Sequence, residues 1–449
     1  MSAYILDVAM LPGGWARAVR VSVDAAGWIT GVEPDAAPHP DDQHLRGIVI
    51  PGMANVHSHA FQRAMAGRAE RGGTGDFWRW RDVMYALAAR LGPDALRAVA
   101  AHLYAEMLEA GYTAVAEFHY LHAAVDDDGP RCMSAALVDA AADAGIGLTL
   151  LPVLYQRAGF DGGPLAPAQQ GFALDTARYL ALLDALAAKH NAQMTTGVAF
   201  HSLRAVDAAA LNEVVAAIDD DTPVHIHVAE QRREVDDCQQ HLGARPVQWL
   251  LDNQPVDPRW CLVHATHTDP GELEGIVSRG ASVGLCPSTE ANLGDGFFAL
   301  EHFEALGGRW AIGSDSQVCI DPTEELRWLE YGARLQAQRR CIVSTAQAPH
   351  AGARLYRAAL TGADGILGRR VGAIAPGYRA DLVALDDRHP LHAGLDGDAR
   401  LDCHVFASPP RTVRDVICGG RRRVRDGRHE HIDALAHAAR SAQGAFDAQ

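Results

Sequence analysis

From residue 47 to about residue 316, the sequence alternates between short apolar runs and amphipathic helical segments. The first apolar unit is "GIVIPGMANVHSH", which we expect to be one strand. A typical helix, "ALRAVAAHLYAEMLEAG", places Leu96, Val99 and Leu103 on one face and ends at Gly111. Strands that alternate with helices indicate a parallel sheet. The eight strand candidates predict an α/β fold, a (β/α)8 TIM-like barrel with its active site at the carboxyl ends of the strands.

An open, doubly wound sheet is the competing architecture, but no G-x-G-x-x-G motif follows the first strand. The two ends of the chain do not follow the alternation and have the pattern of short strands with Gly-rich turns. We therefore expect a small β-sandwich domain built from residues 1–50 and 369–449, and a barrel domain over residues 51–368.

The formal net charge of −16 argues against a nucleic-acid or anionic-membrane partner, so an anionic ligand would have to be bound by local cations. The eight cysteines form no C-x-x-C pair, which is typical of thiols in a reducing compartment. The first residues lack the pattern of a secretory signal, and no uncharged apolar stretch approaches the ~18 residues of a membrane span. We predict a cytoplasmic protein. The acidic clusters 126–128 and 219–221 are interpreted as solvated loops or helix ends.

Residues suited to metal binding or acid–base chemistry stand at the carboxyl ends of six predicted strands. Alternate residues of a strand point to the same side, so His57 and His59 would converge on one spot. A single histidine is more often structural, but gathering so many on one face of one barrel predicts a metal site. In chain order, the strand-end residues are His57 and His59; Glu117, His119 and Tyr120; His201 and Arg204; His225, His227 and Glu230; His264 and His267; and Ser314 and Asp315.

This pattern resembles the metal site of the amidohydrolase superfamily: H-x-H on the first strand, H-x-x-E on the fifth, His on the sixth and Asp after "GS" on the eighth. The resemblance covers essentially the whole chain, and "VGAIAPGYRADLVALD" resembles the returning β-domain segment of that superfamily. Strand alternation leaves both His225 and His227 facing inward, and only the resemblance selects His227. The zinc ligands that it implies are His57, His59, His227 and Asp315, with Glu230 and His264 beside them.

The number of metals can be argued from the lysines. Binuclear members of the superfamily usually bridge two metals with a carboxylated lysine at the end of the fourth strand. Lys189 is the only lysine here and precedes that strand, while "GVAFHSLR" contains none. A glutamate or cysteine bridge stays open. We predict one Zn²⁺ per chain, as in the deaminase branch of the superfamily.

Short stretches carry a closer resemblance, to the formimidoylglutamate deiminase family: "NVHSHAFQRAMAG", "FWRWRDVMY", "EFHYLH", "FHSLRAV", "HIHVAEQ" and "CPSTEANLGDG". One mild departure is "STE", where a second threonine-like residue is expected. The resemblance implies zinc-dependent hydrolysis of the small anionic substrate N-formimino-L-glutamate to N-formyl-L-glutamate and ammonia, in histidine degradation, by a homodimer.

The same resemblance implies roles for single residues. Asp315 would accept a proton from water, His264 would orient that water, and Glu230 would pass a proton to the departing nitrogen. Burying two carboxylates needs charge-assisted donors, for which the candidates are Arg81, Tyr120, His201 and Arg204. Gln62 could hold the formimino end.

Three alternatives remain at this point. Arg81 could be a surface arginine stacked on Trp78 or Trp80. The metal site is shared by purine or pterin deaminases and chlorohydrolases, whose flat substrates would suit Phe61 and the two tryptophans. A barrel that has lost its metal and serves as a scaffold is disfavoured, because all the expected ligands are present.

Overall fold

The computed structural model describes residues 2–70, 76–122, 130–407 and 412–447, so the acidic cluster 126–128 lies outside the described residues. The other cluster, 219–221, is an exposed turn before a barrel strand, as predicted. Within the described part of the chain, no helix is long and apolar enough to cross a membrane.

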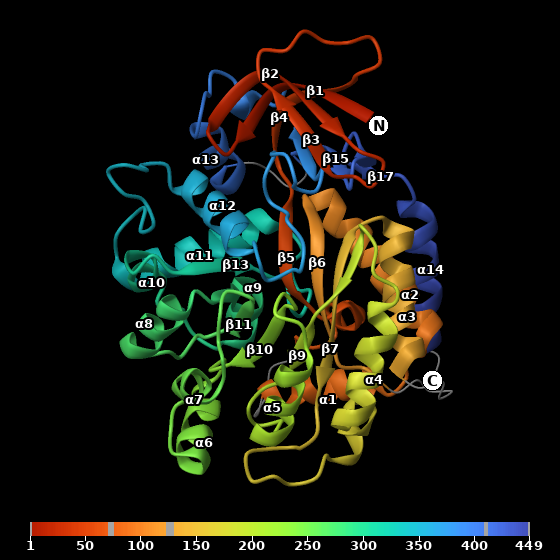
Figure 1. Cartoon of the computed structure of the whole chain (residues 1–449), viewed down its shortest axis with the longest axis vertical. Helices are drawn as coiled ribbons and strands as arrows, with labels where there is room; N and C mark the ends of the chain where they lie inside the picture. The colour runs from red at the N-terminus through yellow and green to blue at the C-terminus, as the bar shows by residue number, and fades with distance from the viewer. Residues whose placement is uncertain (1, 71–75, 123–129, 408–411, 448–449) are drawn as a thin grey trace.

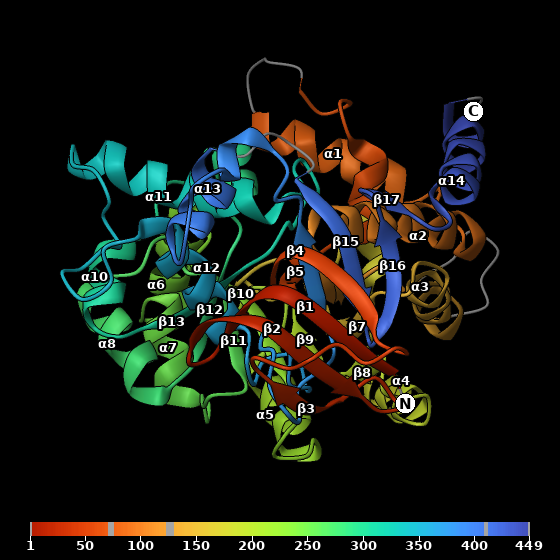
Figure 2. The ribbon, with the colours of Figure 1, turned by 90° about the horizontal axis from the view of Figure 1, so that it is seen from above.

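Eight parallel strands form a nearly closed barrel at the centre of the molecule (Figures 1 and 2), which confirms the predicted fold class. The first and last of these strands meet through a bridge between Ser58 and Asp315, where the Asp315 N–H donates to the His57 carbonyl. In order, the strands are β5 (Met53–Ser58), β6 (Tyr112–His119), β7 (Gly147–Leu154), β9 (Val198–Phe200), β10 (Val224–Val228), β11 (Trp260–His264), β12 (Ser282–Leu285) and β13 (Arg309–Ile312), with the short β8 (Met194–Thr196) paired to β7.

Helices surround the barrel (Figure 2), and their ends follow local sequence signals. The predicted helix is α2 (Pro93–Ala110), which Gly111 ends at a positive φ of 102°. Asp175 and Asp269 are N-caps whose side chains accept backbone N–H bonds. The other helices between strands are α1 (Asp76–Ala88), α3 (Pro130–Ala144), α4 (Thr176–Ala187), α5 (Ala208–Ala217), α6 (Arg232–Leu242), α7 (Pro246–Asn253), α8 (Pro270–Arg279), α9 (Pro287–Leu293), α10 (Leu300–Ala305), α11 (Pro322–Ala337), α12 (Ala351–Gly362), and the 3-10 turns η1 (Ala60–Met65) and η2 (Pro167–Phe172).

A second sheet, at the top of Figure 1, is built from both ends of the chain, as predicted. Its central strand β4 pairs in parallel with β1 and antiparallel with β14, and so joins the N-terminal to the C-terminal part. The strands are β1 (Ser2–Leu11), β2 (Gly14–Val23), β3 (Ile29–Glu33), β4 (Gln43–Pro51), β14 (Leu382–Leu385), β15 (Val413–Cys418), β16 (Arg421–Arg425) and β17 (Arg428–His429). We propose that residues 1–50 and 369–449 form one domain and residues 51–368 the other.

The chain crosses between the two sheets within the segment that we had expected to be one strand. The apolar run before Pro51 belongs to β4, and the barrel strand β5 begins only at Met53. Gly52 occupies the crossing point, where a Cβ atom would overlap the side chain of Thr113. The tail also returns to the barrel, because α13 (Ala399–Phe406) packs on α12 and α14 (Ile432–Asp447) packs on α2, with η3 (Pro390–His392) before them.

Candidate active site

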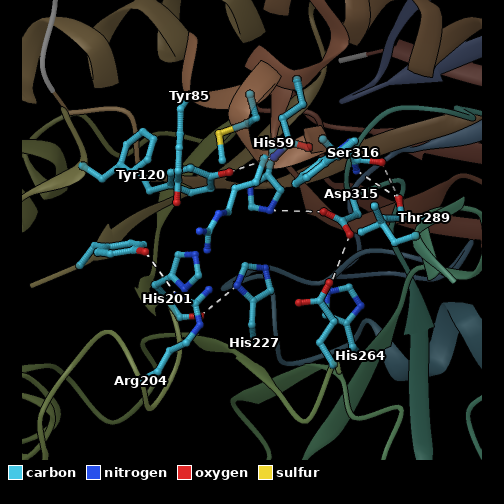
Figure 3. A pocket seen from close by; sticks show the side chains of 18 residues that line it. His59, Tyr85, Tyr120, His201, Arg204, His227, His264, Thr289, Asp315 and Ser316 are labelled. Atoms are coloured by element: carbon cyan, nitrogen blue, oxygen red, sulfur yellow. Dashed lines mark hydrogen bonds and ion pairs between the residues drawn. The ribbon is translucent and has the colours of Figure 1, made fainter. Parts of the chain in front are cut away.

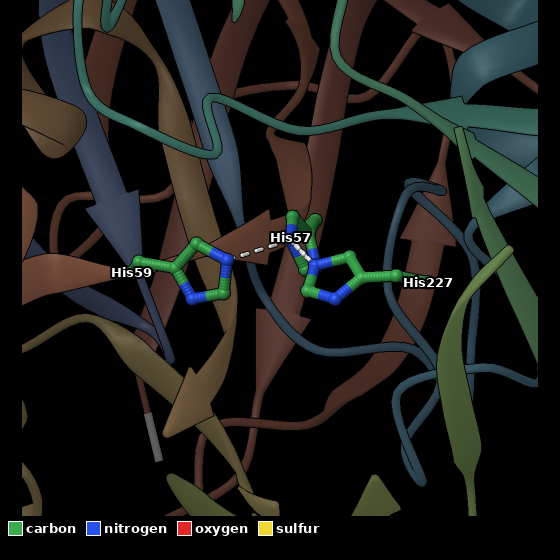
Figure 4. Close-up of side chains that lie close together, drawn as sticks. All are labelled: His57, His59 and His227. Atoms are coloured by element: carbon green, nitrogen blue, oxygen red, sulfur yellow. Dashed lines mark hydrogen bonds between the residues drawn. The ribbon is translucent and has the colours of Figure 1, made fainter. Parts of the chain in front are cut away.

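The carboxyl ends of three barrel strands bring together three histidines, which Figure 4 shows, and one aspartate that lies beside them. His57 Nε2 lies 3.1 Å from His59 Nε2 and 2.9 Å from His227 Nε2. Asp315 Oδ1 lies 3.5 Å from His57 Nε2 and 3.3 Å from His59 Nε2. All four side chains are buried. The structure therefore gathers the four residues that the resemblance implied as metal ligands.

The hydrogen bonds of two of these histidines fix which ring nitrogen carries a proton. His59 Nδ1 lies 2.9 Å from the Phe118 carbonyl, and His227 Nδ1 lies 2.9 Å from the His201 carbonyl. A carbonyl only accepts, so each Nδ1 donates and each Nε2 keeps a lone pair. Burial lowers the pKa of His59 and His227, and lowers that of His57 to about 3, so all three rings are neutral.

Neutral rings whose lone pairs face one another, beside a carboxylate, repel unless a cation lies among them. His57 Nε2 can donate to only one of its two histidine neighbours, and its Nδ1 is buried with no hydrogen-bond partner in the described part of the chain. Three imidazole nitrogens and a carboxylate oxygen are the ligand types that Zn²⁺ prefers, and carbonyls that fix the outer nitrogen are typical of metal-binding histidines. The donor set therefore fits a zinc ion.

His264 lies at the end of β11, between three carboxylates. Its Nε2 is 3.7 Å from Asp315 Oδ2 and 3.9 Å from Glu230 Oε1. Burial alone would lower the pKa of His264, but the neighbouring carboxylates outweigh it and raise that pKa to about 10. Burial raises the pKa of Glu230. The pair is thus suited to holding and passing protons beside the metal ligands.

The third carboxylate, Glu290 on α9, is a residue to which the sequence analysis assigned no role. Glu290 Oε1 lies 3.2 Å from His264 Nδ1 and also accepts the Cys286 N–H at 2.9 Å. The ligand atoms of His264, Cys286 and Glu290 lie within 4.8 Å of one another. If a cysteine or glutamate binds a second metal, this group is where it could do so. The only signal in the sequence was an acidic residue within the family-specific "CPSTEANLG".

A buried network supports the loop of the first two histidines. Ser58, between them, donates to Glu117 Oε2 at 2.6 Å, and the Ala60 N–H donates to Glu117 Oε1 at 2.7 Å. Gln317 Nε2 donates to Ser58 Oγ at 3.0 Å and to the Asp315 carbonyl at 2.8 Å. The network therefore ties the two ends of the barrel sheet together at the site.

Two of the site residues have a backbone conformation that side chains rarely adopt. His264 has a φ of 70° and Asp315 a φ of 46°. Such conformations cost on the order of 1–3 kcal/mol each and are concentrated at functional sites. In this conformation the two side chains approach each other, with His264 Nε2 3.7 Å from Asp315 Oδ2.

A cleft opens beside these residues (Figure 3) and is lined by all the predicted substrate-binding residues. Gln62 Nε2 donates to the Tyr120 hydroxyl at 2.9 Å, while Gln62 Oε1 is buried with no partner among the described residues. Tyr120 also packs edge-on against His59, with ring centroids 5.0 Å apart. Gln62 and Tyr120 are thus held beside the predicted metal ligands, and one amide oxygen has no partner in the described part of the chain.

Arg204 and His201 point into the same cleft from the loop after β9 (Figure 3). Within the described residues Arg204 has no carboxylate partner, and its one hydrogen bond is a long one, 3.5 Å from Nη1 to the Tyr155 hydroxyl. His201 packs edge-on against Tyr155, with ring centroids 4.4 Å apart. A guanidinium in a cleft without an anion is a site for one.

Arg81, on α1, lines the cleft, and its guanidinium lies 5.5 Å from the centroid of the Tyr85 ring. Trp80 also lines the cleft, whereas Phe61 is buried and packs edge-on against Tyr120. The side chain of Trp78 lies outside the described residues. Arg81 therefore combines an aromatic contact with a position where its charge can reach a ligand.

Two of the other strand-end histidines lie away from the group of His57, His59, His227 and Asp315. His225 Nε2 donates to the Ile366 carbonyl at 2.7 Å, at a deeper level of the barrel than His227. His267 Nε2 donates to the Asp295 carbonyl at 2.8 Å. Between the two histidines of "HIHVAE", the structure brings His227 to the site.

A parallel barrel with buried histidine and aspartate donors at its strand ends defines a class of metal-dependent hydrolases. The chain belongs to the amidohydrolase family, whose model matches residues 48–423. Residues 7–45 match a second model, described as the N-terminal domain of formimidoylglutamate deiminase HutF.

The relatives agree with these matches. The chain is 51% identical over 444 residues to the formimidoylglutamate deiminase of Pseudomonas aeruginosa, covering 98% of each chain, which confirms the resemblance found in the sequence. It is 30% identical to a 5-methylthioadenosine/S-adenosylhomocysteine deaminase of Halobacterium salinarum over 89% of this chain and 86% of that one. The crystal structure of an amidohydrolase from Brucella melitensis has a TM-score of 0.93 at 42% identity, covering 99% of this chain and 100% of that chain. An adenosine deaminase from Xanthomonas campestris with bound zinc, 23% identical, shares the fold with a TM-score of 0.82, covering 100% of this chain and 98% of that chain.

Proposed function

We propose that this chain hydrolyses N-formimino-L-glutamate to N-formyl-L-glutamate and ammonia, a step of histidine degradation. The observation that carries the proposal is Arg204, a cation without a carboxylate partner among the described residues, in the same cleft as the donor group of His57, His59 and His227. A substrate with a hydrolysable amidine at one end and carboxylates at the other needs both features. The 51% identity to a formimidoylglutamate deiminase supports the same substrate.

We assign the metal to His57, His59, His227 and Asp315, which would hold one Zn²⁺. A bound zinc ion supplies a Lewis acid that lowers the pKa of water toward ~7. Asp315 accepts a proton from the attacking water, and His264, 3.7 Å from the Asp315 carboxylate, orients that water. Glu230 gives a proton to the substrate nitrogen, so that both protons of the water end on the nitrogen that leaves as ammonia, while the oxygen of the water becomes the formyl oxygen.

Binding of the substrate is assigned to the opposite wall of the cleft. Arg204 grips a carboxylate with its two parallel N–H groups, and Arg81 and His201 supply further donors. Gln62, fixed by its bond to Tyr120, holds the formimino end. This arrangement orients the amidine carbon toward the metal ligands.

Ammonia release by the purified, zinc-loaded protein tests the proposed function. We expect strong release from N-formimino-L-glutamate and little from guanine, 8-oxoguanine or 5-methylthioadenosine measured in parallel. Strong turnover of a purine, with none of N-formimino-L-glutamate, would replace the proposal by a purine deaminase, for which Trp80 offers a stacking surface.

We predict one tightly held zinc per chain, and its loss in His227→Ala. His225→Ala is the matched control, because that ring bonds the Ile366 carbonyl and should leave zinc in place. Elemental analysis of the dialysed proteins measures both. Two zinc ions per chain, both needed for full rate, would contradict the single site and point to the His264, Cys286 and Glu290 group for the second.

We also propose that Glu290 is a positioning residue, because it fixes His264 Nδ1 as the donor and leaves Nε2 facing Asp315. In Glu290→Gln, we expect kcat to fall by about 10- to 100-fold, with KM and zinc content little changed and a shifted pH profile. Glu272→Gln is the matched control. Glu272 is as deeply buried as Glu290, but it accepts a hydrogen bond from Arg245 and caps the start of α8, so we expect only the thermal stability to fall. Loss of stability alone in Glu290→Gln would contradict the role.

We further infer that the enzyme acts in the cytoplasm and as a homodimer. No disulfide joins cysteines in the described part of the chain, and five of the eight cysteines are buried, which suits a reducing compartment.

A further inference from the structure

A buried amide behind the cleft has its orientation fixed by a backbone hydrogen bond. Gln169, on η2, is 4% exposed, and its Oε1 accepts the Ala166 N–H at 3.0 Å. The amide nitrogen therefore faces the other way, where Nε2 lies 2.9 Å from the Tyr155 hydroxyl and 3.3 Å from the Tyr85 hydroxyl. Because an amide nitrogen only donates, both tyrosine oxygens act as acceptors here.

The hydrogen atoms of the two hydroxyls are thus left for a ligand. Arg204 Nη1 also lies 3.5 Å from the Tyr155 hydroxyl, and a guanidinium likewise only donates. In the described part of the chain, no acceptor takes the hydrogen of either tyrosine. Both tyrosines line the same cleft as Arg204, and Figure 3 shows the Tyr85 hydroxyl directed into the cavity. The cleft therefore presents two O–H donors beside a guanidinium.

The aromatic rings that carry these hydroxyls are held by packing. Phe172, the last residue of η2, has its ring centroid 5.8 Å from that of Tyr85 and 5.9 Å from that of Tyr155. Tyr155 also packs edge-on against His201. The same 3-10 turn thus supplies both the amide that directs the hydroxyls and a ring that supports them. Donors that are ordered before the ligand arrives lower the entropy cost of binding.

We propose that Tyr85 and Tyr155 donate to the substrate carboxylate that Arg204 binds, and that Gln169 is a positioning residue that sets the direction of both hydroxyls. The inference rests on the proposed function and deepens it by naming a specificity. A carboxylate only accepts, so it can take all of these donors. A neutral amide at the same place would direct its N–H groups at the hydrogens of these three side chains, and such unpaired groups disfavour its binding.

Tyr155→Phe tests the contact directly, because it removes the hydroxyl and keeps the ring that packs on Phe172 and His201. We expect KM for N-formimino-L-glutamate to rise by about 10- to 100-fold, the range for a hydrogen bond to a charged group, with kcat little changed. Tyr179→Phe is the matched control, since the buried Tyr179 hydroxyl donates to the Pro152 carbonyl at 2.9 Å and does not line the cleft. We expect Tyr179→Phe to lower only the thermal stability.

A double-mutant cycle tests whether Gln169 acts through the two hydroxyls. Gln169→Met removes the N–H donors, so the hydroxyls can rotate, and we expect KM to rise by about 3- to 10-fold. When Gln169→Met is added to Tyr85→Phe/Tyr155→Phe, KM should hardly change further. Gln170→Met is the control and should keep the wild-type KM, because Gln170 also lies on η2 but is exposed and donates to the Leu165 carbonyl. An equal rise in KM with and without the hydroxyls would show that Gln169 acts only on the local fold and would overturn its role.

The neutral diamide glutaramide tests the specificity against glutarate, the matching dicarboxylate. In equilibrium titrations of the zinc-loaded wild type, we expect glutaramide to bind at least about 10-fold more weakly than glutarate, and this preference should shrink in Tyr155→Phe. Equal affinity of the wild type for the two ligands would overturn the specificity.

Because glutarate has no amidine, the same titration separates this inference from the proposed function. We expect the Kd for glutarate to rise by about 10-fold or more in Tyr155→Phe and to stay unchanged in Gln170→Met. If the wild type releases no ammonia from N-formimino-L-glutamate but shows this dependence, the proposed function fails and the carboxylate contact stands. If the wild type does release ammonia while Tyr155→Phe leaves both KM and Kd unchanged, the function stands and the inference is overturned. A wild type that does not bind glutarate overturns the inference as well.

Discussion

Replacing Arg204 with alanine is expected to lower kcat/KM for N-formimino-L-glutamate by roughly 30-fold to several thousand-fold, with the zinc and the fold kept. Removing one partner of a buried charged pair typically costs about 2–5 kcal/mol, much of it the penalty of leaving the other charge unpaired. Among the residues that the structure describes, Arg204 makes one long hydrogen bond, to Tyr155, and faces the cleft, so its guanidinium is available to the substrate. Steady-state kinetics with zinc analysis of the same samples measures the effect.

Two matched variants separate a fixed contact from a general effect of charge. Arg233→Ala removes a cation near the same entrance that already pairs with Asp237, and should change kcat/KM little. Arg204→Lys keeps the charge but loses the paired donors, so its activity should lie between those of wild type and Arg204→Ala. An equal fall in kcat/KM for Arg204→Ala and Arg233→Ala would indicate a general electrostatic effect and would contradict a contact between Arg204 and a substrate carboxylate.

Glu230→Gln is expected to lower kcat by ~10²-fold or more without loss of zinc. Glu230 lies three residues after His227, lines the cleft, and has its carboxylate 3.9 Å from His264 Nε2, so it lies beside the group of His57, His59 and His227 without belonging to it. Glutamine keeps the shape of the side chain and cannot transfer the proton. Turnover close to that of the wild type would move the acid–base role to His264.

Asp237→Asn is a suitable control for Glu230→Gln, because it neutralises a carboxylate on α6 that pairs with Arg233 at the outer wall. We expect its kcat to stay close to that of the wild type. A comparable loss in both variants would indicate a general electrostatic effect instead of proton transfer.

The barrel could be predicted because its evidence is local. The apolar runs, the helical spacing of Leu96, Val99 and Leu103, and the stop at Gly111 all depend on neighbours in the chain. The domain boundary was expected at residues 50 and 51, but the break at Gly52 between two separate strands was not, because β4 and β5 form one apolar run in sequence. Only their pairing with β14 and β6 separates them.

The residue types of the site were predicted, but the contacts that hold those residues in position were not. His57, His59, His227 and Asp315 stand at strand ends, where topology alone brings them to one face of the barrel. Strand-end position could not decide between His225 and His227, because both point inward and they differ only in their place along the strand, by about 6.6 Å. The link from Glu290 to His264 joins residues 26 positions apart and leaves no periodic trace in the sequence.

The sequence by itself therefore determined the order of strands and helices, the ligand types and the strand ends that carry them, since these follow from short-range periodicity. Only the tertiary structure decided that His57 Nε2 and His227 Nε2, 170 residues apart in the chain, lie 2.9 Å from each other. It also decided which nitrogens are free to bind a metal, because the carbonyls of Phe118 and His201 fix the opposite side of two rings. Such contacts depend on how distant strands pair, and no local pattern of residues encodes them.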